Sequence, residues 1–208
     1  QYSGKPVISL ESATRHPCQA FADLITIEEF KTKKRPKVVL SWAPHPKALP
    51  QAVPNSFAEW MKAADVDFVF TAPEGYDLAP DIMEGLTPER DQMKAFKDAD
   101  FIYAKNWSCP GVTNPNDYGK ILQDYKSMAH WTVDAEHMAW TNNGKFMHCL
   151  PAYHNLETQV GRDVNKQFGL DGIEVTEEVF ESEASIVFDE AENRMHTIKA
   201  VMVATLGD

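Results

Sequence analysis

Two short segments of the sequence bring together side chains that can do chemistry. Residues 147–151 read Met-His-Cys-Leu-Pro, and residues 16–19 read His-Pro-Cys-Gln within a polar stretch that starts at Glu11. Each segment follows a short apolar run, and the second leads into a helix whose first turn is predicted to begin near Pro17. Because α/β proteins bind substrates where parallel strands end, the two segments predict one shared polar site.

The second of these segments, residues 16–19, suits a carbamoyl group. Pro17 fits the first position of a helix, where free backbone amides favour negative charge or a polarised carbonyl. His16 can donate to a carbonyl oxygen, and the side-chain carbonyl of Gln19 can accept from an NH2 group. The alternative is an ordinary helix start with Thr14 and Arg15 in solvent.

Other chemistries have weaker support in the sequence. An ordinary strand end with a buried thiol also explains His148 and Cys149. A cysteine nucleophile needs a lowered thiol pKa and a positioned base, and neither follows from the sequence. Zinc would need His16, Cys18, His148, Cys149 and His154 to gather, but no C-x-x-C or H-x-x-x-H pair occurs. We therefore predict no metal and, since both phosphate-binding glycine motifs are absent, no cofactor.

The composition limits the class of protein. The chain has 208 residues, is 43% hydrophobic and carries a net charge of −11, which argues against nucleic acid and anionic membranes as partners. No apolar run reaches the roughly 18 residues of a membrane span, and we expect a cytoplasmic protein. The three cysteines, at positions 18, 109 and 149, do not suggest a disulfide framework. The chain starts at Gln1 and soon enters the apolar run 6–10, so we expect that an N-terminal part is missing.

Short β-rich runs alternate with amphipathic segments along the chain. This alternation predicts an α/β fold, a doubly wound parallel sheet with helices on both faces. Strands are expected at 7–10, 37–42, 67–72, 100–105, 145–150 and 185–188, and helices at 18–30, 56–64, 89–98, 135–141, 176–182 and 191–206. A proline-rich loop at 42–50 and a polar segment at 106–126 interrupt the alternation.

Three motifs together resemble the transcarbamylase family in their order and spacing. They are His-Pro-Cys-Gln at 16–19, His-Cys-Leu-Pro at 148–151 and Glu-Ala-Glu-Asn-Arg at 190–194. The resemblance covers nearly the whole chain and implies the second half of such an enzyme. It implies a linking strand and helix at 1–30, an amino-acid-binding domain at 31–190, and a C-terminal helix at 191–208 that returns to a carbamoyl-phosphate domain. The S-x-R-T-R phosphate loop of that domain does not occur in this chain.

The resemblance also implies the roles of individual residues. Carbamoyl phosphate would be bound by His16, Pro17, Cys18, Gln19, Cys149, Leu150 and Arg194, of which His16, Gln19 and Arg194 would act in catalysis. The amino-acid substrate would be held by Glu11, His45, Lys105 and Leu150. Two simpler readings remain open: Arg194 could be a helix cation paired with Glu190, and His45 could be a solvated loop residue.

Lys105 favours an acylated substrate. This chain reads Ala-Lys-Asn-Trp at residues 104–107. By resemblance, ornithine transcarbamylases usually carry T-D-V-W there, and the aspartate pairs with the α-ammonium of ornithine. A lysine would repel that ammonium, whereas an acylated α-nitrogen has no charge, so that a lysine can bind the carboxylate or acyl oxygens. The expected substrate is therefore an N-acylornithine, N-succinyl or N-acetyl, with a closer resemblance to the succinyl branch.

The resemblance changes after residue 151. The acylornithine branch continues with an apolar residue and then R-R-N, whereas this chain reads Ala152-Tyr153-His154-Asn155, so that Tyr153 replaces a substrate-facing arginine. From there on the chain looks more like an ornithine transcarbamylase. It is either a natural relative that combines both patterns or a chimera joined near Pro151. An ornithine-specific enzyme and a non-catalytic binding domain are the alternatives.

The family also implies an assembly. Transcarbamylases are homotrimers with sites between subunits, and the acylornithine branch has a knotted chain. We expect the loop of the knot at 44–54.

Overall fold

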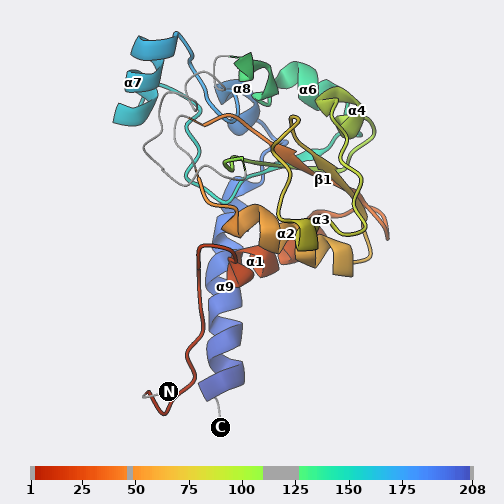
Figure 1. Cartoon of the computed structure of the whole chain (residues 1–208), viewed down its shortest axis with the longest axis vertical. Coiled ribbons are helices and arrows are strands. Elements are labelled where there is room, and N and C mark those ends of the chain that lie inside the picture. Colours follow the sequence, from red (N-terminus) through yellow and green to blue (C-terminus); the bar gives the residue numbers. More distant parts are fainter. Residues whose placement is uncertain (1–2, 46–48, 110–126, 207–208) are drawn as a thin grey trace.

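A sheet of four parallel strands forms the centre of the molecule (Figure 1). The computed structural model describes residues 3–45, 49–109 and 127–206. The strands are β1 (Lys37–Trp42), β2 (Asp67–Thr71), β3 (Phe101–Lys105) and β4 (Lys145–Met147), and their order in the sheet is β2-β1-β3-β4. The register pairs Val39 with Val69 on one side and with Ile102 on the other.

Helices cover both faces of this sheet. One face carries α1 (Pro17–Phe30), α2 (Ala52–Ala63) and α3 (Pro80–Met83); the other carries α4 (Gln92–Phe96), α6 (Ala135–Ala139) and α8 (Glu177–Phe180). Since side chains alternate along a strand, Val38 and Leu40 pack toward α1 and α2, whereas Val39 packs toward α4 and α8. The predicted doubly wound parallel sheet is confirmed.

Three further elements complete the described chain. The long helix α9 (Val187–Leu206) packs along α1 and extends past the body of the molecule (Figure 1). The short 3-10 helix η1 spans Ala129–Trp131. Helix α7 (Gln159–Phe168), which the sequence analysis did not predict, packs on a small cluster of its own that includes Tyr153.

Two strand predictions were wrong. Residues 3–16 contain no strand, and Val7 is 81% exposed. A β-rich run is stable as a strand only where a neighbouring strand pairs with it, and residues 7–10 have no such neighbour in the described chain. At 185–188, Ser185 forms a single bridge with Phe146, and the residues from Val187 onward belong to α9.

Helix α1 begins at Pro17, as predicted. A proline is favourable there because its missing N–H has no partner within the helix and its fixed φ angle suits the first turn. This start places residue 16 at the N-cap and Gln19 in the first turn, both at the carboxyl end of the sheet.

The order of the strands sets the position of the site. The chain moves from β1 to β2 on one side and then returns to place β3 on the other side of β1. Substrates of open α/β sheets bind at such a switch point, beyond the carboxyl ends of the strands. His45 follows β1, Lys105 ends β3, and residues 148–151 follow β4.

Some sequence predictions fall partly outside the described residues. These are residues 46–48 of the expected knot loop and residues 110–126 of the polar segment. Within the described part of the chain, no helix combines the length and apolar character needed to cross a membrane. The three cysteines are free thiols.

Candidate active site

A cavity of about 260 Å³ lies at the carboxyl ends of β3 and β4. It is lined by Glu11, His16, Gln19, Leu49, Pro50, Ala52, Val53, Lys105, Cys149, Leu150 and Pro151. The structure therefore brings together six of the site residues predicted from the sequence, from three separate segments of the chain. The start of α2 closes the cavity with apolar side chains.

His16 presents a nitrogen that has no partner among the described residues. Its Nδ1 atom is buried without a hydrogen bond, while Nε2 lies 3.7 Å from the Glu11 carboxylate. Burial lowers the pKa of His16, the charges of Arg194 and Lys105 lower it further, and Glu11 opposes them. The imidazole is therefore neutral at neutral pH and can donate one N–H to a carbonyl oxygen.

Gln19 is held by two buried carboxyl groups. Its Nε2 donates to Asp23 Oδ1 at 2.8 Å and to Glu190 Oε1 at 3.4 Å. Because only the nitrogen of an amide can donate, these contacts place Nε2 toward the two carboxyl groups and Oε1 on the opposite side. The side-chain carbonyl is then free to accept from a ligand in the cavity that Gln19 lines.

Lys105 brings a positive charge to the cavity. Desolvation lowers its pKa, but Cys149, Glu174 and Glu11 raise it above its ordinary value, so the ammonium form is stable. Its ammonium group makes no hydrogen bond or ion pair within the described chain. An incoming carboxylate or carbonyl oxygen can therefore bind it without displacing a partner from the described part of the chain.

The buried carboxylate of Glu174 lies close enough to Lys105 for their charges to interact. Glu174 Oε1 lies 3.1 Å from His148 Nε2, and both side chains are inaccessible to solvent. Desolvation would raise the pKa of Glu174, but the contacts with His148, and then Lys105 and His45, lower it to about 2. Glu174 is therefore a permanent negative charge.

The segment that follows β4 lines the cavity with Cys149, Leu150 and Pro151. Leu150 has a φ angle of 51°, a left-handed conformation that is rare for a branched residue and costs about 1–3 kcal/mol. Its N–H donates to His148 Nδ1 at 2.9 Å. Burial, with Glu190 and Asp23 adding to it, raises the pKa of Cys149 to about 12, against the lowering effect of Lys105 and Tyr103. Cys149 is thus a neutral thiol and not a nucleophile.

Four predicted residues lie near the cavity but do not line it: Pro17, Cys18, His45 and Arg194. Arg194 is half-buried, and its Nη1 atom has no partner in the described chain, so the predicted alternative of an ion pair with Glu190 is not formed. His45 is 8% exposed and packs against the ring of Tyr153, so it is not a solvated loop residue.

Comparison with known proteins decides the family. Residues 50–205 match the family described as aspartate/ornithine carbamoyltransferase, Asp/Orn binding domain. The chain belongs to this carbamoyltransferase family. An N-succinylornithine carbamoyltransferase of Bacteroides thetaiotaomicron is 56% identical over 194 residues, which are 93% of this chain and 54% of that protein. The chain therefore spans about half the length of this relative.

Other relatives agree with this assignment. An ornithine carbamoyltransferase of Borreliella burgdorferi is 39% identical over 219 residues, covering 99% of this chain and 64% of that protein. Among solved structures, an acetylornithine transcarbamylase complexed with acetylcitrulline superposes with a TM-score of 0.79 at 36% identity, covering all of this chain and 60% of that one. An N-acetyl-L-ornithine transcarbamylase variant complexed with carbamyl phosphate and N-succinyl-L-norvaline superposes with a TM-score of 0.80 at 34% sequence identity. The match covers 99% of this chain and 60% of that one.

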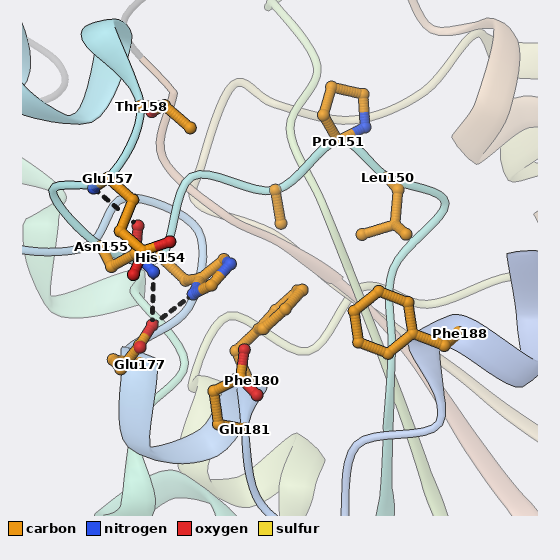
Figure 2. A pocket seen from close by; sticks show the side chains of 11 residues that line it. Leu150, Pro151, His154, Asn155, Glu157, Thr158, Glu177, Phe180, Glu181 and Phe188 are labelled. Carbon is orange, nitrogen blue, oxygen red and sulfur yellow. Dashed lines mark hydrogen bonds and ion pairs between the residues drawn. The ribbon is translucent and has the colours of Figure 1, made fainter.

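A second, open cavity of about 930 Å³ lies on the other side of Leu150 and Pro151. Figure 2 shows His154 and Asn155 pointing at the Glu177 carboxylate, beside the ring of Phe180. His154, Glu177 and Glu181 are the one group of metal-ligand side chains in the described residues, and both carboxylates are exposed. His154 is already bonded to Glu177 and stacked on Phe180. These contacts fasten the loop after Pro151 to α8, and the five residues considered for zinc do not meet.

Sequence reasoning missed the carboxylates that support the site. Asp23, Glu174 and Glu190 are all buried, and each contacts a residue at the cavity or in the segment that follows β4. Asp23 stands four residues after Gln19, on the same face of α1. That spacing, and the acidic residue within the motif at 190–194, were signals that could have identified two of them.

Proposed function

We propose that this chain is the amino-acid-binding half of an N-acylornithine carbamoyltransferase. The reaction transfers the carbamoyl group of carbamoyl phosphate to the δ-amine of N-succinyl- or N-acetylornithine, giving N-acylcitrulline and phosphate, as a step of arginine biosynthesis. The names of the relatives and the ligands of the solved structures support these substrates.

The position of Lys105 is the observation that carries the proposal. Its ammonium group lines the same cavity as His16 and Gln19 and has no partner in the described chain. A substrate with a free α-ammonium would place like charges together, which costs binding energy. An acylated substrate offers only carboxylate and carbonyl oxygens, and these form charge-assisted hydrogen bonds with a lysine.

The proposed mechanism depends on orientation and oxyanion stabilisation. His16 donates to the carbamoyl oxygen, and the Gln19 carbonyl accepts from the carbamoyl NH2, while Arg194 and the backbone at Cys149 and Leu150 complete that side. The neutral δ-amine attacks the carbamoyl carbon, a carbon–nitrogen bond forms, and the carbon–oxygen bond to phosphate breaks. The amine proton leaves with solvent or the departing phosphate, so no protein nucleophile is needed.

The remaining proposed substrate contacts come from Glu11, His45 and Leu150. Glu11 lines the cavity, His45 lies behind it, and Leu150 separates it from the second cavity. Tyr153, at the position of the expected arginine, packs against His45 and the α7 cluster. We propose that a cation of a preceding domain meets the acyl end.

The larger assembly is also a proposal. We propose residues 1–30 as a linker, 31–190 as the acylornithine domain and 191–208 as the helix that returns to a preceding carbamoyl-phosphate domain. We further propose a cytoplasmic homotrimer with a knotted chain, its loop at 44–54. These features rest on the resemblance to the acylornithine branch.

Ornithine itself is the runner-up substrate. Tyr153 and the sequence after it favour this alternative, as does the similarity to the Borreliella ornithine carbamoyltransferase over 99% of this chain. The ammonium of Lys105 in the cavity opposes it.

The test is carbamoyl transfer by a full-length protein that includes the preceding domain proposed above. Ornithine, N-acetylornithine and N-succinylornithine are offered separately with carbamoyl phosphate, and the products are identified by mass. We expect turnover of an acylated substrate and little turnover of ornithine. Turnover of ornithine alone would favour the runner-up, and turnover of none would favour a non-catalytic binding domain.

A further inference from the structure

Two buried carboxyl groups connect the first and last helices of the chain. Asp23 of α1 and Glu190 of α9 have no solvent-exposed surface, and both carboxyl groups accept a hydrogen bond from the same nitrogen of Gln19. Burial raises the pKa of both groups, and for Glu190 the neighbouring Asp23 raises it further. Two adjacent buried carboxylates cannot both ionise at modest cost. Asp23 Oδ2 is buried and has no hydrogen-bond partner in the described chain, so it is an atom that a shared proton could occupy.

The pair holds the two parts of the site in place. Gln19 Nε2 donates to both carboxyl groups, at 2.8 Å and 3.4 Å. The other oxygen of Glu190 accepts from the backbone N–H of His148 at 2.9 Å, and His148 in turn accepts from the N–H of Leu150. The same two carboxyls therefore contact the glutamine side chain and the segment after β4.

We infer that Asp23 and Glu190 are positioning residues that share a proton and orient the Gln19 amide, so that its carbonyl faces the carbamoyl NH2. The inference rests on the proposed function, since it assigns a purpose to that carbonyl. If the Gln19 amide were reversed, its carbonyl would face two carboxyl groups and its NH2 would face the NH2 of the ligand.

Other ionisable groups surround the pair. Tyr103 comes from β3, Cys149 follows β4, and Arg194 lies one turn after Glu190 on α9. Burial raises the pKa of Tyr103 well above its ordinary value, and that of Cys149 to about 12, so both are neutral at physiological pH. Arg194 is the positive charge that acts on Asp23, and it balances one negative charge on the pair.

Asp23→Asn tests the orientation in the full-length protein. Asparagine keeps the size of the side chain, but its NH2 can donate to the Gln19 carbonyl and so permits the reversed amide. We expect kcat to fall about 10- to 100-fold, with a much smaller change in KM for the acylated amino acid. Asp100→Asn is the matched control, because Asp100 is a buried carboxylate at the opposite end of the sheet, bonded to the backbone of Lys37. It should lower stability and leave kcat unchanged.

Infrared spectroscopy tests the shared proton without any need for activity. A protonated carboxyl group has a carbonyl stretch that is absent from carboxylates, and it should persist at pH 7, where exposed carboxyls have ionised. The band should be altered in Asp23→Asn and in Glu190→Gln, and should be unchanged in Asp100→Asn. Absence of the band from the wild-type protein would overturn the shared proton, whether or not the variants fold.

The outcomes separate this inference from the proposed function. If the wild-type protein transfers carbamoyl groups and a folded Asp23→Asn variant retains wild-type kcat, the positioning role is wrong. If the wild-type protein transfers no carbamoyl group to any amine, the proposed function fails and the orienting role fails with it. The infrared band then still reports the shared proton by itself.

Discussion

At the scale of single residues, the buried Glu174 links the site to acid stability. Its pKa in the folded protein is about 2, below its ordinary value of 4.5. A lowered pKa stabilises the folded protein above pH 4.5, and this contribution is lost as the pH falls toward 2. The difference corresponds to about 3 kcal/mol. We predict that the unfolding free energy, measured by urea titration, falls steeply across this range.

Glu174→Gln should flatten that dependence. Glu178→Gln is the control, because Glu178 is exposed on the same stretch of chain. An unchanged pH profile in Glu174→Gln would show that the carboxylate next to His148 does not carry the acid sensitivity.

The sequence identified the residues of the cavity better than the residues that support them. His16, Gln19, Lys105 and Leu150 belong to recognisable motifs or to positions where the family varies in a meaningful way. The buried carboxylates do not, because an acidic residue in a sequence is usually exposed. Only the fold shows that α1, α9 and the segment after β4 enclose Asp23 and Glu190 together.

At the scale of elements, helix α7 depends on its caps. The Thr158 side chain accepts a hydrogen bond from the N–H of Gly161 at 3.0 Å, and Gly169 ends the helix in a left-handed conformation. Thr158→Ala should therefore lower the unfolding free energy by about 1 kcal/mol, measured by urea titration.

Helix α8 provides a matched control for that prediction. Thr176 is also an N-cap residue, with a similar backbone conformation, but its side chain makes no capping bond. Thr176→Ala removes no capping hydrogen bond, so it should not lower the unfolding free energy through loss of a cap. Equal losses in the two variants would mean that the capping bond of Thr158 contributes nothing.

The strands that were predicted correctly from the sequence are those whose apolar residues the sheet buries. The four core strands are apolar runs that the sheet buries, and their predicted positions agree with the structure to within three residues. The run at 7–10 has the same composition but no neighbouring strand in the described chain. Helix α7 is mainly polar, but Val160, Val164 and Phe168 recur every four residues and pack in one cluster, so that this spacing and the two caps were the available signals.

At the scale of the whole molecule, α9 and the first residues expose an apolar surface. Met202, Val203 and Leu206 on α9 are each more than half exposed, as is Val7. Figure 1 shows this end of α9 beyond the body of the molecule. A surface of this kind usually contacts another domain or chain, and we propose the preceding carbamoyl-phosphate domain.

Methionine oxidation tests this contact. Peroxide should convert Met202 to the sulfoxide readily in the 208-residue chain and several times more slowly in the full-length protein, as measured by mass spectrometry. Met61, which is 1% exposed, should be protected in both. Equal oxidation of Met202 in the two proteins would contradict the domain contact.

The most direct test of the account is the substrate preference of Lys105→Asp in the full-length protein. The ratio of kcat/KM for N-acylornithine to that for ornithine should favour the acylated substrate in the wild type. In Lys105→Asp it should fall by about 100-fold, since a charge-assisted hydrogen bond is replaced by repulsion of the carboxylate. Lys94→Asp, on the exposed side of α4, should retain the wild-type ratio. An unchanged ratio in Lys105→Asp would show that this lysine does not select the acylated substrate.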